Sequence, residues 1–423
     1  MARQYFGTDG VRGVVGEELT EDLVERLGRA FARWSSGAGV LIGRDTRASG
    51  PALEAALVSG LAQGGSSVTL GGVLPTPAVA LLAEEAGAVV SASHNPAEYN
   101  GIKFFRDGLK LEDPEEEAIE ALLDDVDGAA PAGSVTDVPG LGERYVELVS
   151  ERFGAPLGGL RVVMDCANGA MVDVGPAVFD RLGAAVTVIG DKPDGTNINA
   201  GCGATDLALL SRTVAGGDFD LGVAFDGDGD RLLAVDAAGT PVDGDQILAV
   251  LALYLGVDLV AVTQMTNLGF HRLMRERGVR VLTTAVGDRY VLEALRASEG
   301  VLGGEQSGHV IYLNGHVTGD GLAAALLLCR AVVEQERQLA ELAAAFDRFP
   351  QMMENVRVRS KALPEAVLQE AERINAELGE RGRVLVRPSG TEPVVRVLAE
   401  AETEPEAQQL CARIVPLVQR ELG

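Results

Sequence analysis

Short β-branched stretches alternate with longer Ala- and Leu-rich stretches along most of the chain, and this alternation constrains the fold more than any other feature. The pattern predicts a strand at Val40–Gly43 and a helix at Pro51–Gly64, and the same order returns at Arg161–Asp165 and Val174–Leu182. It returns a third time over Val260–Ile311. Because a helix between two strands usually connects parallel neighbours, we predict α/β units with ligand sites at the carboxyl ends of their strands.

Two stretches interrupt the alternation and indicate domain boundaries. Asp127–Gly142 is rich in Gly, Ala, Pro and Asp, and Phe349–Gln351 follows a long helical pattern over Leu322–Arg348. After Pro350 the order changes to strand, helix, two strands and helix, which is typical of a small α+β unit. We therefore predict three successive α/β domains with mixed sheets and a smaller C-terminal α+β domain, all within the usual domain size. The predicted bounds are residues 1–142, 143–241, 242–350 and 351–423.

The charge balance of the chain disfavours some partners. Against 62 Asp and Glu there are 36 Lys and Arg, a formal net charge of −26, so we expect neither nucleic acid nor an anionic membrane as a partner. Anionic small molecules stay open, because salt screens surface charge beyond about 8 Å and a few Arg side chains inside a cleft can dominate locally. Only four basic residues are Lys and none follows a Gly, which excludes a Walker A phosphate loop.

Cysteine spacing and apolar stretches indicate the compartment. The four Cys are far apart with no C-x-x-C, so we predict isolated thiols in a reducing compartment rather than a zinc or redox pair. The N-terminus shows no apolar signal region. The longest apolar stretches, Ile247–Val257 and Leu322–Cys329, are too short to span a bilayer. We expect a cytoplasmic protein.

The strongest chemical signal is the run Asp226–Arg231, with the sequence Asp-Gly-Asp-Gly-Asp-Arg, directly after the apolar strand Leu221–Phe225. Carboxylates two residues apart face the same way if the loop is extended. Such oxygen ligands suit Mg²⁺, which keeps positions for water or phosphate oxygens. An EF-hand is excluded, because the sixth position is Arg231 rather than Gly and the twelfth is Ala237 rather than Glu. A solvated acidic turn is the alternative.

A second signal, Ser91–Pro96, also follows a predicted strand. Ser93 stands next to His94, but adjacent side chains in extended backbone face opposite ways. A hydrolase nucleophile elbow has the motif Gly-x-Ser-x-Gly. Around Ser93, the two glycine positions are occupied by Ser91 and Asn95. Because a metal motif is present, a phosphoryl-carrying hydroxyl is the better use of Ser93. A capped Asn-Pro turn is the alternative.

The segment Arg387–Pro393, between two predicted strands, gathers groups that bind anions. A glycine frees the backbone to present N–H groups, while hydroxyl and guanidinium donors stand on both sides of it. A bare turn is the alternative, but the density of donors favours phosphate binding. The donors of the segment are Arg387, Ser389, Gly390 and Thr391, and Arg396 follows three residues after its end.

Two further segments carry weaker signals. In Gly304–His309, a carboxylate, a hydroxyl and an imidazole lie between glycines, which suits a polyol such as a sugar, with a polar turn as the alternative. In Phe6–Gly13, three glycines in eight residues surround Arg12, which predicts an irregular loop that offers a cation. The polar side chains of the first segment are Glu305, Ser307 and His309.

Together and in this order, the five segments resemble the α-D-phosphohexomutase superfamily over essentially the whole chain. Three segments are closest to the bacterial members that act on glucosamine phosphates: Phe6–Gly13, Asn197–Asp206 and Val286–Tyr290. The resemblance implies a mutase that interconverts glucosamine 6-phosphate and glucosamine 1-phosphate through a phosphoserine enzyme and a 1,6-bisphosphate. A glucose- or mannose-type mutase is the alternative, although some of those relatives carry a Lys where this chain has Ala285.

The resemblance also implies a role for each matching residue. Lys103 or His94 would move the hydroxyl proton, and Lys103 would need a pKa well below about 10.4 to act as a base, which nearby cations could cause. Ser93, as the phosphoserine, completes the metal site. The implied groups are Ser93, Asp226, Asp228 and Asp230 for the metal; Ser93, His94, Lys103, Arg12 and Arg231 for catalysis; Glu305, Ser307 and His309 for the sugar; and Arg387, Ser389, Gly390, Thr391 and Arg396 for the non-reacting phosphate.

The resemblance further implies one Mg²⁺ per chain, a sugar bisphosphate such as glucosamine 1,6-bisphosphate as activator, a small-molecule sugar phosphate as partner, and four domains around a central cleft. A homodimer stays open. Two readings from other classes are a Mg²⁺-dependent phosphatase or kinase, and a non-catalytic sugar-phosphate sensor. A kinase lacks its nucleotide motif here, and a sensor would be expected to have lost Ser93 or the Asp triplet.

Overall fold

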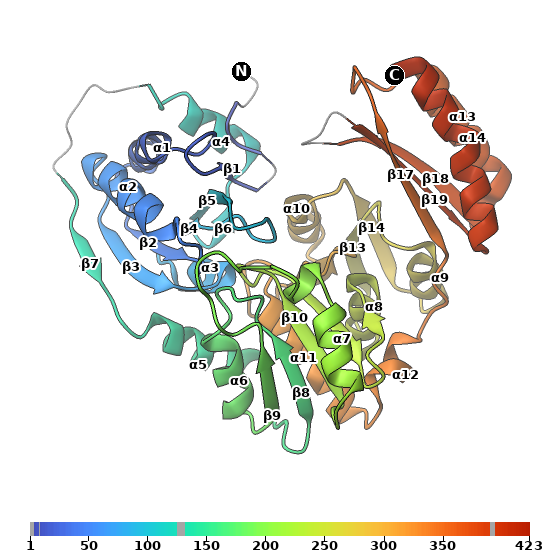
Figure 1. Ribbon diagram of the computed structural model, residues 1–423, viewed down its shortest axis with the longest axis horizontal. Coiled ribbons are helices and arrows are strands. Elements are labelled where there is room, and N and C mark those ends of the chain that lie inside the picture. The colour runs from blue at the N-terminus through green and yellow to red at the C-terminus, as the bar shows by residue number, and fades with distance from the viewer. Residues whose placement is uncertain (1–3, 8, 125–131, 390–393) are drawn as a thin grey trace. The chain divides into compact units, whose positions relative to one another are not determined.

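The computed structural model describes residues 4–7, 9–124, 132–389 and 394–423. The chain forms two compact units (Figure 1). The first unit comprises Met1–Met265 and Val279–Ala345, and the second comprises Thr266–Gly278 and Phe346–Gly423. Among the described residues, the first unit contains three sheets and the second contains one.

The first sheet is mixed, with the order β1-β5-β4-β2-β3-β7 and β6 paired to β5. Strands β2, β3, β4 and β7 are parallel, whereas β5 runs antiparallel between β4 and β1. Helices α1 and α2 approach so closely that a Cβ on Gly60 would lie only 1.9 Å from the Glu25 carbonyl oxygen. The elements are β1 (Val11–Val14), α1 (Glu21–Trp34), β2 (Val40–Arg44), α2 (Gly50–Gln63), β3 (Val68–Val73), α3 (Thr76–Leu82), β4 (Ala86–Val90), β5 (Tyr99–Arg106), β6 (Leu109–Lys110), α4 (Asp113–Glu120) and β7 (Val135–Asp137).

The second sheet, with the order β12-β11-β10-β8-β9, presents the run of aspartates. Strand β10 pairs parallel with β8 and antiparallel with β11, and the Phe225–Leu232 pair closes the loop between β10 and β11. Residues 226–231 are therefore fixed at both ends by a buried sheet. The elements are α5 (Leu141–Phe153), β8 (Arg161–Asp165), α6 (Val174–Arg181), β9 (Ala185–Ile189), α7 (Ala208–Ala215), β10 (Leu221–Phe225), β11 (Leu232–Asp236) and β12 (Pro241–Val242).

The third sheet, with the order β14-β13-β15-β16, is parallel except for β16. The helix predicted over Leu322–Arg348 is wrong in its length. Helix α11 ends at Glu334, because the polar run that follows leaves the buried face and Glu336 adopts a left-handed φ of 52°. The elements are α8 (Gly244–Leu255), β13 (Leu259–Thr263), β14 (Arg280–Thr284), α10 (Asp288–Ser298), β15 (Leu302–Gly304), β16 (Val310–Tyr312), α11 (Gly321–Glu334) and α12 (Leu339–Ala343).

The second unit is an antiparallel sheet of order β17-β19-β18 with α13 and α14 on one face (Figure 1). Its core alternates along the strands, as a half-buried sheet requires, and includes Val384, Val386, Val395 and Val397. Helix α9 also belongs to this unit. The elements are α9 (Leu268–Glu276), β17 (Gln351–Arg357), α13 (Glu365–Leu378), β18 (Gly382–Pro388), β19 (Val394–Ala401) and α14 (Glu404–Leu422).

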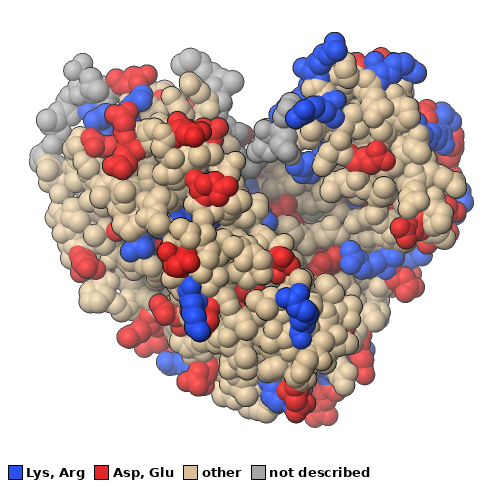
Figure 2. Space-filling view, viewed as in Figure 1, with Lys and Arg blue, Asp and Glu red and all other residues tan. Residues whose placement is uncertain are grey.

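This architecture confirms the predicted fold class of three α/β domains with mixed sheets followed by an α+β domain. The exact domain bounds stay a prediction. All four cysteines are buried and free of disulfides, as predicted. No helix in the described ranges is both long and apolar enough to cross a membrane. Figure 2 shows acidic and basic side chains interspersed over the face in view.

Candidate active site

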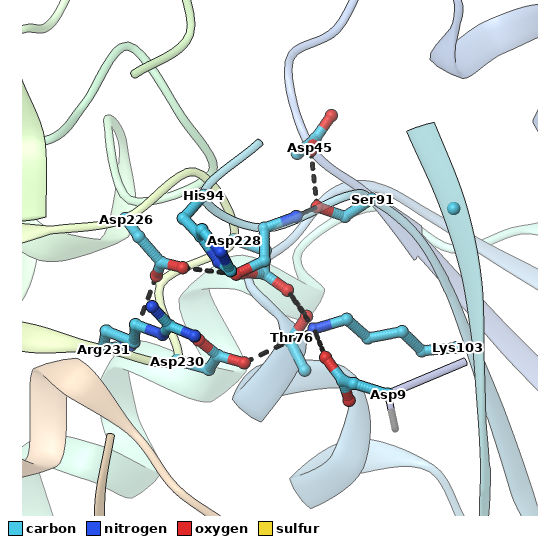
Figure 3. A network of polar contacts seen from close by, with 12 residues as sticks. Asp9, Asp45, Thr76, Ser91, His94, Lys103, Asp226, Asp228, Asp230 and Arg231 are labelled. Atoms are coloured by element: carbon cyan, nitrogen blue, oxygen red, sulfur yellow. Dashed lines mark hydrogen bonds and ion pairs between the residues drawn. The ribbon is translucent and has the colours of Figure 1, made fainter. Parts of the chain in front are cut away.

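Loops that follow two buried strands of the first unit meet at one place (Figure 3). We call Ser91–Tyr99, after β4, the serine loop, and Asp226–Arg231, after β10, the acidic loop. Their backbones touch: a Cβ on Gly227 would lie 2.6 Å from the Ser93 carbonyl oxygen. Only a residue without a side chain fits at that position, so the glycine allows the two loops to meet.

The acidic loop brings its three carboxylates together by turning, not by extending. Gly229 has a φ of +74°, and its N–H donates to the Asp226 carbonyl oxygen at 3.1 Å. The condition of an extended loop, under which alternate carboxylates would face the same way, is therefore not met. The turn nevertheless places one oxygen of each buried aspartate, Asp226, Asp228 and Asp230, within 4.8 Å of the others.

The electrostatics of this cluster suit a divalent cation. Burial, with repulsion from the other two carboxylates, raises the pKa of Asp226 above its ordinary value. The Oδ1 atoms of Asp228 and Asp230 are buried and accept no hydrogen bond from the described residues. A hard cation with oxygen ligands would satisfy both atoms and offset the repulsion. The donor set therefore fits Mg²⁺.

Lys103, on β5, is the nearest cation to the carboxylates. Its Nζ lies 2.8 Å from Asp228, 2.9 Å from Asp9 and 3.4 Å from Asp230. Burial alone would lower the pKa of Lys103, but the three carboxylates outweigh it and hold the pKa well above its ordinary value. This direction is opposite to the lowered pKa that Lys103 would need to act as a base, because the carboxylates around Lys103 outweigh the nearby cations.

Ser93 lies against the carboxylates. Its Oγ donates to Asp226 Oδ2 at 2.5 Å and lies 3.3 Å from His94 Nδ1. The two adjacent side chains do not face opposite ways as expected, because Ser93 has a left-handed φ of 52°. Burial, aided by Arg231 and Arg12, lowers the pKa of His94 to about 4. The imidazole of His94 is therefore neutral at pH 7 and can accept a proton. The choice of the base between His94 and Lys103 stays a prediction.

Two arginines flank the cluster. Arg12, on β1, pairs with Asp9, while the backbone N–H of Arg231 donates to Asp226 Oδ1 at 3.2 Å. Burial opposes the charge of Arg231, but the surrounding carboxylates outweigh it and raise its pKa. In both arginines Nε is buried without a hydrogen-bond acceptor among the described residues. Such donors suit the oxygens of a phosphoryl group.

The three residues predicted to bind the sugar lie in different surroundings. Glu305, after β15, accepts from the Gly287 N–H at 3.0 Å, and Ser307 is exposed. His309 is buried, with Nε2 3.1 Å from Asp288 and Nδ1 3.7 Å from Asp230. Burial lowers the pKa of His309, but these carboxylates outweigh it and raise the pKa to about 10. His309 therefore lies in the charge network, and sugar contacts by all three residues stay a prediction.

Sequence reasoning missed three members of this network. Lys110 donates to Asp9 Oδ1 at 2.7 Å and also pairs with Asp288. Asp9 in turn contacts Lys103, so a continuous chain of opposite charges joins β6, α10 and the acidic loop. Asp9 and Asp288 stood inside segments already singled out, but nothing in a single sequence marks them as partners of a lysine.

The predicted phosphate residues belong to the second unit. Arg387 on β18 and Arg396 on β19 are direct cross-strand neighbours, on the face opposite the valine core. Like charges in that position repel, so the pair is suited to an anion. Ser389 is buried and its N–H donates to the Val394 carbonyl oxygen at 2.9 Å. Gly390 and Thr391 lie outside the described residues.

Comparison with known proteins agrees with this geometry. Four family models match: phosphoglucomutase/phosphomannomutase alpha/beta/alpha domains I, II and III at residues 3–129, 143–239 and 243–349, and the C-terminal domain at residues 328–417. A phosphoglucosamine mutase of Desulforudis audaxviator is 49% identical, over 98% of this chain and 97% of the relative. One from Clostridioides difficile is 44% identical over 100% of both chains.

Solved structures show the same fold. A phosphoglucomutase/phosphomannomutase family protein of Burkholderia thailandensis has a TM-score of 0.85 at 24% identity, covering 98% of this chain and 96% of that one. An N-acetylphosphoglucosamine mutase of Aspergillus fumigatus, in complex with GlcNAc-6P and magnesium, has a TM-score of 0.70 at 18% identity, covering 99% and 96%. The resemblance found in the sequence is thus confirmed. The chain belongs to the phosphoglucomutase/phosphomannomutase family, and within it to the phosphoglucosamine mutases.

Proposed function

We propose that the chain interconverts glucosamine 6-phosphate and glucosamine 1-phosphate through phosphorylated Ser93. The observation that carries the proposal is the Ser93 Oγ, 2.5 Å from a carboxylate of a buried acidic cluster. A hydroxyl in that position can carry a phosphoryl group next to a divalent cation. The choice of sugar rests on the relatives, which are named phosphoglucosamine mutase over the full chain.

Asp226, Asp228 and Asp230 would hold one Mg²⁺ together with an oxygen of the Ser93 phosphate. Bound there, the ion would neutralise charge on the transferred group. Arg12 and Arg231 would bind phosphoryl oxygens through donors that the described protein leaves unused. Since phosphoryl transfer depends on positioning and charge stabilisation more than on covalent chemistry, these groups account for most of what the site must supply.

In the first step the Ser93 Oγ–phosphorus bond breaks and a bond forms between phosphorus and the free hydroxyl of the hexosamine phosphate. His94 accepts the hydroxyl proton, which Ser93 Oγ finally receives, and a 1,6-bisphosphate results. Transfer of its other phosphoryl group back to Ser93 reverses these changes. Lys103 stays charged and orients Asp228. We assign Glu305 and Ser307 to the sugar hydroxyls, and Arg387, Ser389, Gly390, Thr391 and Arg396 to the non-reacting phosphate, on the family resemblance.

A sugar bisphosphate would phosphorylate Ser93 and act as activator. One related structure, of an N-acetylphosphoglucosamine mutase variant from Aspergillus fumigatus, is in complex with glucose 1,6-bisphosphate. By the same chemistry, a bisphosphate that leaves before the second transfer would leave Ser93 without its phosphoryl group, and a new bisphosphate would restore it.

The deciding experiment measures kcat/KM for glucosamine, glucose and mannose phosphates side by side, with Mg²⁺ and a trace of glucose 1,6-bisphosphate. We expect glucosamine phosphate to lead by orders of magnitude. A glucose or mannose phosphate that matched it would contradict the choice of sugar and leave the mutase reaction standing. Stoichiometric release of inorganic phosphate would instead indicate a phosphatase, and binding without turnover would indicate a sensor.

A further inference from the structure

Ser93 holds a backbone conformation that a serine does not adopt by preference. Its φ of 52° lies in the left-handed region, which is strained for a residue with a Cβ. Such strain persists only where the surroundings fix the backbone, and it concentrates at functional sites. The groups that hold the Ser93 carbonyl and amide therefore decide where Oγ points.

The first of these groups is Arg47, which follows β2 and is fully buried. Its Nη2 donates to the carbonyl oxygen of Ser93 at 3.0 Å and to that of Asn95 at 2.8 Å. Its Nη1 donates to the carbonyl oxygen of Tyr99 at 2.9 Å and also to that of Pro96. One guanidinium thus binds four carbonyl oxygens of the serine loop.

Asp45 extends this support through its contacts with Arg47 and Ser91. Its Oδ2 accepts from Arg47 Nε at 2.9 Å and from Ser91 Oγ at 2.5 Å. Ser91 Oγ in turn accepts from the Ser93 N–H at 2.9 Å. Both the amide and the carbonyl of Ser93 are therefore connected to the same buried ion pair.

The second group comes from Asn199, in the segment Asn197–Asp206 that the reaction does not otherwise use. Its Nδ2 donates to the same two carbonyl oxygens, Ser93 at 2.9 Å and Asn95 at 3.2 Å. The loops that carry Arg47 and Asn199 are joined, because the Ala48 N–H donates to the Gly195 carbonyl oxygen at 2.9 Å. The carbonyl of Ser93 is thus held by side chains from loops that follow strands of two different sheets, β2 and β9.

We infer that Arg47 and Asn199 form a carbonyl clamp that keeps Ser93 left-handed, with its Oγ directed at the acidic loop. Both are positioning residues: their side-chain hydrogen bonds go to backbone carbonyl oxygens and to Asp45, and none of those to described residues goes to the acidic loop's carboxylates. The inference rests on the proposed function, in which Ser93 Oγ must attack phosphorus. Loss of the clamp would move Oγ without altering the groups that bind substrate.

The half-reaction that reports on the clamp is phosphorylation of Ser93 by glucose 1,6-bisphosphate. A sugar-oxygen–phosphorus bond breaks, a Ser93 Oγ–phosphorus bond forms, and the serine proton ends on the sugar oxygen. Intact-mass measurement of a single turnover, with Mg²⁺ present and Ser93 initially unphosphorylated, gives the rate directly. Steady-state kinetics then separate kcat from KM.

The variants are Asn199→Asp, Arg47→Lys and a control, Asn197→Asp. Asn199 itself has a φ of 59°, which Asp tolerates well, so the first change removes the donor and keeps the shape. Asn197 also donates to a carbonyl oxygen, that of Lys192 at 2.9 Å, and none of its hydrogen bonds to described residues goes to the serine loop. Arg47→Lys keeps the cation beside Asp45 and loses the planar fork.

We expect Asn199→Asp and Arg47→Lys to slow Ser93 phosphorylation and kcat by about 10–100-fold, because small misplacements of reacting atoms cost that much. KM for the sugar phosphate should stay within about threefold of the wild type, since the substrate contacts are unchanged. Asn197→Asp should behave as wild type. If Arg47→Lys fails to fold, Asn199→Asp, at a half-buried position, decides alone.

Phosphorylation of Asn199→Asp at the wild-type rate would overturn the clamp, and so would equal slowing in Asn197→Asp. A rise in KM with kcat unchanged would also overturn it, because the residue would then act on binding. If wild-type protein itself neither isomerised glucosamine phosphate nor accepted a phosphoryl group, the proposed function would fall, and the clamp with it. If the wild type turns over and the variants are unaffected, only the clamp is contradicted and the proposed function stands.

Discussion

The acidic loop of the first unit and the arginine pair of the second unit gather charge of opposite sign by opposite means. Three aspartates come from one turn of six residues, and their countercharges, such as Lys103 and His309, come from distant elements. Arg387 and Arg396 come from two neighbouring strands that place them side by side. The first arrangement concentrates negative charge inside the protein, while the second presents positive charge on one face of a sheet.

A contrast within the second sheet sharpens this comparison. On the same two strands, Arg383 lies opposite Glu400 and forms an ion pair with it, whereas Arg387 lies opposite another arginine. The Arg383–Glu400 pair carries no net charge, whereas the Arg387–Arg396 pair consists of two positive charges. The proposed function uses both clusters of like charge: the acidic loop would bind a cation, and the arginine pair would bind an anion.

The largest effect should come from the group that carries the phosphoryl group. Ser93→Ala is expected to lower kcat by at least about 10⁴-fold, the order lost when a covalent nucleophile is removed. Sugar phosphate should still bind, because the groups assigned to it remain. Calorimetric titration with glucosamine 6-phosphate and a mutase assay check both parts. Turnover at the wild-type rate would show that Ser93 carries no phosphoryl group and would place the chemistry elsewhere.

The next effect concerns the cation at the acidic loop. In the metal-free protein the raised pKa of Asp226 means that its ionisation opposes folding, so stability should fall as pH rises from about 4 through that raised pKa. Mg²⁺ should therefore raise the melting temperature more at pH 8 than at pH 5. Asp226→Asn should flatten the metal-free pH dependence and weaken Mg²⁺ binding by at least about tenfold.

Scanning calorimetry with and without Mg²⁺ measures these changes. Asp180→Asn, at an exposed position, is the matched control and should leave both the pH dependence and the Mg²⁺ effect unaltered. A Mg²⁺ effect of the same size in Asp226→Asn would mean that the ion binds somewhere other than the acidic loop.

A smaller effect should separate the two cross-strand pairs of the second sheet. Arg396→Gln removes a charge-assisted donor and should raise KM for the sugar phosphate about 10–100-fold, with a lesser change in kcat. Arg383→Gln leaves the buried Glu400 without its ion-pair partner and should instead lower the unfolding free energy by about 3 kcal/mol. Initial rates and thermal melts of both variants test the division, and it fails if their effects are exchanged.

The smallest effect concerns acid sensitivity of the second unit. Burial, with the nearby cations Arg383 and Arg275, lowers the pKa of His271 to about 4. The unfolded chain therefore binds a proton that the folded unit refuses between about pH 6.5 and 4, and stability should fall as pH falls through that window. His271→Gln should melt with a shallower decline. Identical slopes for variant and wild type below pH 6.5 would contradict the prediction.

Much of the fold and of the site could be predicted from sequence, because those parts depend on local pattern. The strands at Arg161–Asp165 and Leu221–Phe225 have the predicted bounds, since short apolar runs between turns mark them clearly. The three carboxylates of the acidic loop lie in one short turn, so the sequence alone also predicts that they lie close together. The loop is not extended, however, because Gly229 adopts a left-handed φ.

What could not be predicted depends on contacts between distant segments. Strand β5, which carries Lys103, runs antiparallel beside β4, and its polar residues interrupt the apolar pattern that marks a strand. Arg47 was not singled out, because a single arginine after a strand gives no sign that it will bind carbonyls of another loop. Similarly, His309 suited a sugar by its residue type, but the carboxylates around it come from two other segments.

The spacing of these contacts along the chain has a consequence for folding. Lys103 and Asp228 are 125 residues apart, and Lys110 and Asp288 are 178 apart. During synthesis the acidic loop therefore follows Lys103 out of the ribosome but precedes His309, its last countercharge. Folding dominated by such long-range contacts is slow, and the three sheets of the first unit should gain stability together rather than one by one. A fragment spanning residues 143–241 would possess the aspartates and none of the lysines that stabilise them.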